Sequence, residues 1–237
     1  MSFTVKLTTD AHDEDFNRVI RASAVLRYMQ IAANTHLHVM GPTTDQLLSE
    51  GHAFILSSVD ITINRPLRAY EEVECTTWPC PPRGFTFPRC YCLKKGEEEL
   101  AVCTSGWAMI EIDSRRLVRP TEVELGLETS APLPNPQRRF KAPHPDEMTL
   151  GGTYPVTYAQ TDLNHHLNNT YYPDMFTSFL NMQGRRVSHL SIRFLREATL
   201  GEVLTVYKKE EGDTYLLVSV RSDGEVNAEA CITLTNL

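Results

Sequence analysis

The chain has 237 residues, 41% of them hydrophobic and 22% charged, which is ordinary for a globular protein and enough to form a substantial core. A net charge of -7 argues against nucleic acid as the main partner, because phosphate binding needs a basic surface, although local basic patches can still meet an acidic protein. No apolar run approaches the roughly 20 residues of a membrane span, and the first residues lack a secretory pattern, so we expect a cytoplasmic protein.

The first half of the chain predicts one helix followed by several strands. Asp15 and Asn17 precede an apolar helix over residues 24–40, which Gly41 and Pro42 end. Strand-like runs follow at residues 54–63, 72–77, 86–93 and 100–112.

A proline-rich segment divides the chain. Residues 129–149 hold five prolines and a basic cluster, and proline at this density blocks both helix interiors and sheet ladders. We therefore expect an extended linker here, between an N-terminal domain of residues 1–128 and a C-terminal domain of residues 150–237.

The second half repeats the pattern of the first. A helix is predicted over residues 171–182, with Gly184 at its end. Strands are predicted at residues 189–195, 203–207, 214–220 and 226–235.

Two short sequence matches link the halves. The Asp-x-Asn pattern at Asp15 recurs 147 positions later at Asp162, and the Ile-x-apolar-x-Arg pattern at Ile61 recurs 131 positions later at Ile192. The smaller second offset predicts a shorter connection between helix and strand in the second half. Such short matches can arise by chance, but together they favour a duplicated α+β unit.

The richest chemistry lies just before the predicted second helix. Asp162, Asn164 and His166 combine the side-chain types that polarise a carbonyl, move a proton and stabilise a developing negative charge. Pro173 is tolerated in a first helical turn, which places the helix start near Asn169 and these groups at its N-terminus. The same residue types also serve commonly as loop and cap residues, and this interpretation stays open.

Structural roles are expected for several other polar residues. His36 and His38 are two apart and do not share a helix face, so they are expected in a core or interface and not as metal ligands. We expect His165 to be structural or exposed, and Asn168 and Asn169 to cap the helix.

The cysteines give no sign of a metal or disulfide framework. No CxxC pair occurs among them, so we expect reduced thiols, with structural zinc as the minor alternative. The sequence predicts neither a metal nor a cofactor. The six cysteines are Cys75, Cys80, Cys90, Cys92, Cys103 and Cys231.

Together these features resemble the acyl-acyl carrier protein thioesterases of the plant and bacterial type, over almost the whole chain. The most specific match is Asp-x-Asn-x-His-x-Asn-Asn-x-x-Tyr, from Asp162 to Tyr172, which is similar to the signature of the family's second domain. The missing plastid transit region implies a bacterial form. Further matches are the first helix from Val25 to Gly41, Arg65-Pro66, Ser105 to Met109, Ser114 to Leu117, the linker, and Arg196-Glu197.

The resemblance implies a double hotdog fold: two tandem hotdog domains, each a long helix wrapped by an antiparallel β-sheet. It implies hydrolysis of fatty acyl-acyl carrier protein (acyl-ACP) to free fatty acid. The alternatives are an acyl-CoA thioesterase and a non-catalytic acyl-binding hotdog protein. The expected partner is acyl carrier protein, without nucleic acid or a membrane span, and the chain is expected as a monomer or homodimer.

The resemblance also implies roles for single residues. Asn164 and His166 would bind and polarise the thioester carbonyl, and Asp162 would hold the Asn164 carboxamide or the loop. Glu197 stands at the position of the family's catalytic glutamate and would activate or position water. Some members carry a cysteine directly after that glutamate; here the residue is Ala198, so we expect attack by water and not by a cysteine.

Two further expectations concern the surroundings of the site. Alternation along residues 190–194 places Glu197 on the opposite face of its strand, so a bulge or strand end must redirect it. The resemblance places the acyl chain in the first domain, where the predicted lining residues are Val25, Met29, Ala32, Ala33 and His36. Basic residues that could meet the carrier protein, or could simply be solvated surface charges, are Arg138, Arg139, Lys141, Arg185 and Arg186.

Overall fold

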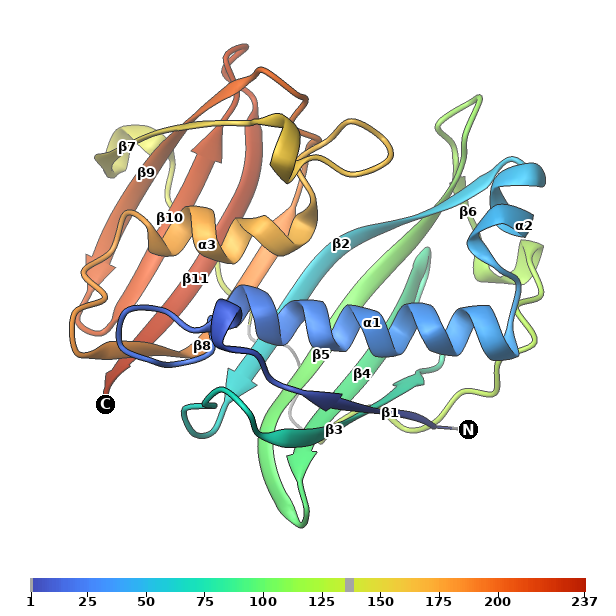
Figure 1. Ribbon diagram of the computed structural model, residues 1–237. Coiled ribbons are helices and arrows are strands. Elements are labelled where there is room, and N and C mark those ends of the chain that lie inside the picture. The colour runs from blue at the N-terminus through green and yellow to red at the C-terminus, as the bar shows by residue number, and fades with distance from the viewer. Residues whose placement is uncertain (1, 135–138) are drawn as a thin grey trace.

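Both halves of the chain contribute to one antiparallel sheet. The computed structural model describes residues 2–134 and 139–237. The sheet formed by these residues has 11 strands, and helices α1 and α3 lie on the same face of it (Figure 1).

The helices are α1 (Ala22–Met40), α2 (Thr44–Ser49) and α3 (Tyr172–Thr177), with short 3₁₀ helices at Ala11–Asp13, Pro120–Glu122, Pro145–Glu147, Tyr158–Gln160 and Asn169–Tyr171. The strands are β1 (Phe3–Thr8), β2 (His52–Ile63), β3 (Glu72–Pro79), β4 (Thr86–Lys95), β5 (Glu98–Glu111), β6 (Leu117–Val118), β7 (Thr149–Pro155), β8 (Arg185–Phe194), β9 (Val203–Glu211), β10 (Thr214–Val220) and β11 (Val226–Asn236).

The strand order makes the duplication visible. The order is β1-β3-β4-β5-β2-β8-β11-β10-β9-β7, so each half contributes its strands in the same sequence from the edge inward. The halves join where β2 pairs antiparallel with β8, from Ser58 opposite Arg193 to Thr62 opposite His189. This topology agrees with the duplicated α+β unit predicted from the short sequence matches.

The second helix is shorter than predicted. We expected a helix over residues 171–182, but α3 ends at Thr177. Beyond it, Phe179 N–H donates to Phe176 O at 3.2 Å and Leu180 N–H to Thr177 O at 3.0 Å, so i→i+3 bonds replace the α-helical pattern. The expectation of a long helix in each half is therefore wrong for the second half.

The core lies between the helices and the inner face of the sheet. Val25, Met29 and Ala32 of α1 are completely buried, as are Val59 and Ile61 of β2, whose alternation turns every second residue inward. Burying each large aliphatic side chain contributes about 1.5–3 kcal/mol, which fixes α1 on the sheet and with it the space beside its C-terminal half.

Candidate active site

The predicted catalytic residues lie on a loop that Asp162 holds closed. Its Oδ1 accepts hydrogen bonds from the backbone N–H of Asn164 at 2.9 Å and of His166 at 3.2 Å. Its own N–H donates to His166 O at 2.9 Å, and His165 takes a left-handed conformation with φ 62°. The Asp162 carboxylate thus holds the loop backbone, which is one of the two roles considered for it.

Asn168 caps the 3₁₀ helix that leads into α3, as predicted, whereas Asn169, also expected as a cap, is the first residue of that helix. Its side chain accepts from the backbone N–H of Thr170 at 3.0 Å and from the Thr170 hydroxyl at 2.8 Å. Pro173 lies in the first turn of α3, again as predicted.

The same loop exists in the first half of the chain. Asp15 Oδ1 accepts from the backbone N–H of Asn17 at 2.8 Å and of Val19 at 3.1 Å, and Arg18 has φ 60°. The loop geometry is therefore a folding device common to both halves. The two copies differ in their side chains, and the first difference is His166, whose counterpart is Val19.

In the first half, the turn that follows α3 engages the side chain of Asn17. The Asn17 side chain donates from Nδ2 to Met182 O at 2.6 Å and to Arg185 O at 3.1 Å, and its Oδ1 accepts from Gly184 N–H at 3.1 Å. The turn that follows α3 thus occupies the space beside Asn17. Its counterpart Asn164 is exposed and lies in the wall of a cavity.

Glu197 meets the loop from the neighbouring strand. Its Oε2 lies 3.4 Å from His166 Nε2, and its Oε1 accepts from Arg115 Nη1 at 3.2 Å. Arg115 belongs to the turn between β5 and β6, so the first half of the chain reaches the carboxylate across the cavity mouth. By the 131-residue offset, the counterpart of Glu197 in the first half is Pro66, which has no carboxylate.

A bulge-like strand end redirects Glu197. Strand β8 ends at Phe194, and the next two amides, of Leu195 and Arg196, both donate to Asn227 O, at 2.9 and 3.0 Å. Two consecutive residues, Leu195 and Arg196, thus face the single residue Asn227 of β11, which breaks the alternation of side chains as in a β-bulge. The expected redirection of Glu197 at a strand end is confirmed.

Asn227 secures this strand end with its side chain as well. It is completely buried; its Nδ2 donates to Arg196 O at 2.6 Å and to the Tyr172 hydroxyl at 3.0 Å, and its Oδ1 accepts from Ser219 Oγ at 2.9 Å. Its counterpart by hydrogen bonding is Leu100, an apolar residue. The Leu100 carbonyl accepts from Asn64 N–H at 2.8 Å, and Asn64 corresponds to Leu195 by the offset of 131. Asn227 was not among the predicted site residues, because it lies inside a regular strand pattern.

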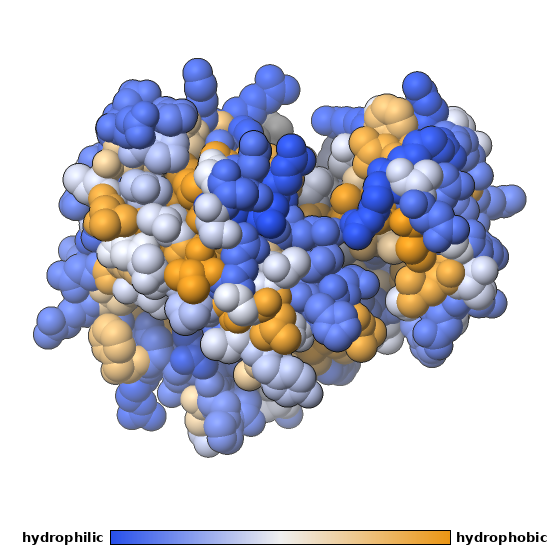
Figure 2. Space-filling view, turned by 90° about the horizontal axis from the view of Figure 1, so that it is seen from above, coloured by the Kyte–Doolittle hydropathy of each residue, from blue (hydrophilic) through white to orange (hydrophobic). Residues whose placement is uncertain are grey.

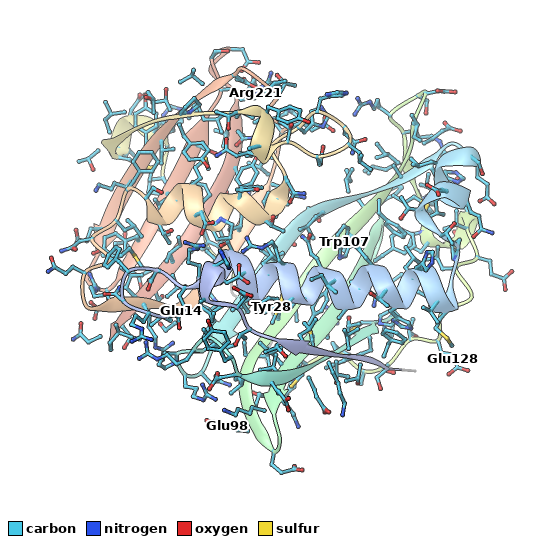
Figure 3. All side chains as sticks on the ribbon, in the orientation of Figure 1. Glu14, Tyr28, Glu98, Trp107, Glu128 and Arg221 are labelled. Atoms are coloured by element: carbon cyan, nitrogen blue, oxygen red, sulfur yellow. The ribbon has the colours of Figure 1, made fainter. Side chains whose placement is uncertain are left out.

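A cavity of about 850 Å³ opens beside these residues. Asp162, Asn164, His166 and Glu197 line one part of it, and residues of α1, α2, β2, β4 and β5 line the rest. Viewed from above, this face is hollowed between the two halves, with hydrophobic side chains on the walls among polar ones (Figure 2). Trp107 of β5 lines the cavity from the first half and Arg221 from the second (Figure 3).

The residues predicted to line an acyl pocket fall into two groups. Ala33 lies in the cavity wall. Val25, Met29 and Ala32 are buried in the core, and His36 is buried with its Nδ1 3.0 Å from Arg89 Nη1. Burial lowers the pKa of His36 to about 4, and the positive charge of Arg89 adds to this effect. A role for all five residues in holding an acyl chain stays a prediction.

The predicted basic residues do not form one surface. Arg185 pairs with Asp213 at 2.6 Å, and Arg186 donates to Ile63 O at 2.9 Å, so both hold the fold together. Arg139 and Lys141 are exposed, while Arg138 lies outside the described residues.

Residues 2–134 and 139–237 hold no group of three or more histidine, cysteine or acidic side chains arranged to bind a metal ion. In the same residues, no helix combines the length and the apolar character needed to cross a membrane.

Comparison with known proteins decides the family. The family model described as acyl-ACP thioesterase N-terminal domain matches residues 1–124, and the C-terminal domain model of the same family matches residues 144–236. The chain belongs to the acyl-ACP thioesterase family. It is therefore a thioester hydrolase that acts on fatty acyl-ACP, as the resemblance implied. A search of curated protein sequences gives no match.

Solved structures show the same fold over the full chain. An acyl-ACP thioesterase from Bacteroides thetaiotaomicron has a TM-score of 0.87 at 18% identity, covering 99% of this chain and 98% of its own. A putative oleoyl thioesterase from Lactobacillus plantarum has a TM-score of 0.85 at 20% identity, covering 100% and 97%. The 12:0-ACP thioesterase from Umbellularia californica has a TM-score of 0.84 at 16% identity, covering 100% and 98%.

Proposed function

We propose that this acyl-ACP thioesterase cleaves its substrate by direct attack of water, organised by Asn164, His166 and Glu197. The observation that carries the proposal is the contact of 3.4 Å between His166 Nε2 and Glu197 Oε2 at the wall of the cavity. The first half supports it as an internal comparison. That half keeps the Asp15 loop but has Val19 and Pro66 in place of the imidazole and the carboxylate.

In the proposed reaction, the Glu197 carboxylate takes a proton from water as the water oxygen bonds to the carbonyl carbon. The Asn164 carboxamide and His166 stabilise the negative charge that develops on the carbonyl oxygen. Collapse of this intermediate breaks the carbon–sulfur bond, and the leaving thiolate takes up the proton held by Glu197. Free acid and carrier thiol are the products, and no covalent enzyme intermediate forms.

The wider organisation follows from the same proposal. Residues 1–128 and 150–237 form two hotdog units, with residues 129–149 as the linker, and the first unit holds most of the acyl chain. Acyl carrier protein presents the substrate at the cavity mouth, in the cytoplasm. Acyl-CoA is the alternative substrate, because the phosphopantetheine arm that carries the thioester is common to both.

Turnover of purified protein with acyl-ACP tests the proposed roles. We expect Glu197→Gln to lower kcat by about 100- to 10,000-fold, as for loss of a general base. We expect His166→Ala to lower kcat by about 100- to 1000-fold, as for loss of an oxyanion donor. The matched control is Val19→Ala, which truncates the equivalent loop position and should leave kcat unchanged. Full activity of Glu197→Gln would refute the mechanism.

A panel of acyl-ACP and acyl-CoA substrates with the same acyl groups separates the remaining alternatives. Faster turnover of acyl-CoA would show that coenzyme A, and not acyl carrier protein, carries the preferred substrate. Tight acyl binding without hydrolysis of any thioester would identify a binding protein in place of an enzyme.

A further inference from the structure

An arginine lies buried in the wall of the cavity, far from the catalytic loop. Arg89 of β4 is only 9% exposed and lines the cavity together with Ala33 and Leu37 of α1. Burying a cation is unfavourable unless an anion or several acceptors compensate it. The buried charge of Arg89 therefore needs a compensating partner.

The protein gives Arg89 only neutral partners. Its Nη1 lies 3.0 Å from His36 Nδ1 and donates to Thr77 Oγ1 at 3.2 Å. His36 is neutral near pH 7, since its pKa is about 4. Among the described residues, the hydrogen bonds of Arg89 are these two, both made by Nη1, and no carboxylate pairs with it. Desolvation accordingly lowers the pKa of Arg89 below its ordinary range.

The position of Arg89 is remote from the reacting bond. Across the sheet Arg89 is opposite Ser105, Ser105 is opposite Val59, and Val59 is opposite Ile192. Three strand spacings, roughly 14 Å, thus separate Arg89 from β8, the strand that leads to Glu197. Trp107 of β5 lines the same cavity (Figure 3).

We propose that Arg89 forms an oxygen-binding subsite for the distal part of the acyl chain. The preferred substrates are then acyl thioesters whose chain carries a hydroxyl, keto or carboxylate oxygen, with a carboxylate bound most strongly. Such an oxygen accepts from the guanidinium donors that the protein leaves open, and a carboxylate also neutralises the buried charge. This inference rests on the proposed function for the catalytic step, but the binding of the chain end is a separate property.

Turnover and binding test the subsite separately. Purified enzyme is given octanoyl-, decanoyl- and dodecanoyl-ACP, each beside its ω-hydroxy and ω-carboxy analogue. For the matching chain length we expect kcat/KM to be higher for the oxygenated chain. Arg89→Met should lower the ratio of oxygenated to plain substrate by about 10- to 100-fold, in line with loss of a charge-assisted hydrogen bond.

Two control variants isolate the role of the guanidinium. Arg89→Lys keeps the charge and should retain part of the preference. Arg83→Met makes the same substitution at an exposed site just before β4 and should leave the ratio unchanged. The thermal shift caused by free decanedioic acid, compared with decanoic acid, reports binding without catalysis and should depend on Arg89.

The outcomes distinguish the two proposals. If no thioester is hydrolysed but decanedioic acid still stabilises the wild type and not Arg89→Met, the subsite stands and the catalytic proposal fails. If hydrolysis is normal and Arg89→Met changes all chains equally, or if plain chains are always preferred, the subsite is refuted. If Arg89→Met does not fold, the ratio measured with Arg89→Lys and the acid-induced thermal shift of the wild type decide.

Discussion

Asn227 offers the sharpest test of how the fold places the catalytic carboxylate. In the substitution Asn227→Leu, a branched side chain with the same number of heavy atoms replaces the carboxamide, so no cavity forms. Leucine is also the residue, Leu100, whose carbonyl accepts the corresponding amide bond in the first half. The change removes three hydrogen bonds, to Arg196 O, the Tyr172 hydroxyl and Ser219 Oγ.

The expected magnitudes follow from those bonds. Ser219 Oγ keeps a second acceptor, Ala228 O at 3.3 Å, whereas the Tyr172 hydroxyl is left buried without a described partner. An orphaned buried polar group costs about 1–3 kcal/mol, so with Arg196 O also weakened we expect a loss of about 2–5 kcal/mol in the free energy of unfolding. Release of Arg196 O lets Glu197 shift, and a displacement of about 1 Å costs about 100-fold in rate.

Urea unfolding and kcat at saturating acyl-ACP, both measured on the same preparation, check the prediction. Ser219→Ala is the matched control: it weakens the same network on the side away from Glu197, so stability should fall while kcat stays nearly unchanged. A folded Asn227→Leu enzyme with full kcat would refute the positioning role. Equal losses of kcat in both variants would show a general loss of packing instead.

Three more predictions use other contacts of the site. Asn17→Ala should lower the free energy of unfolding with kcat unchanged, because the Asn17 side chain holds the turn after α3. Asn164→Ala, at the equivalent position, should lower kcat by about 100-fold with stability unchanged. Urea unfolding and turnover assays of both variants check this pair of expectations. Arg115→Met should change kcat by less than about tenfold, since an exposed ion pair contributes at most about 1 kcal/mol; a larger loss in the turnover assay would give Arg115 a direct role. His36 takes up its proton near pH 6.5 in the unfolded chain but only near pH 4 in the folded protein. The free energy of unfolding should therefore fall by about 3 kcal/mol as the pH falls from 6.5 to 4. Urea unfolding of His36→Gln should lack that part of the decrease.

Much of the fold was predictable because its signals are local. Helix α1 begins two residues before its predicted start and ends at the predicted residue, where Gly41 follows. The interior strands appear where alternation placed them. Edge strands β1 and β7 were missed: β7 contains a Gly-Gly pair and ends in proline, which hides any alternating pattern.

The candidate site was only partly predictable, because its geometry depends on contacts distant in sequence. The Asp162 loop could be predicted, since its bonds join neighbours. The orientation of Glu197 depends on Asn227, which lies 30 residues later in the chain (197 to 227). Comparison of the two halves in sequence does not find Asn227, because the offset of 131 aligns it with Gly96; only the hydrogen bonds of the fold pair it with Leu100. Arg115 reaches the site across the cavity mouth, and no local pattern predicts that contact.

On the proposed mechanism, the use of Asn17 to hold the turn after α3 leaves one catalytic loop in the chain. A duplicated fold offers two equivalent loops, yet the turn after α3 fills the space beside one of them, while the longer connection through α2 leaves the other accessible. One polypeptide should therefore bind one equivalent of a tight, non-hydrolysable acyl-ACP analogue. The inactive half is then released from catalytic constraint, so its sequence can diverge to suit different acyl groups while the chemistry stays fixed.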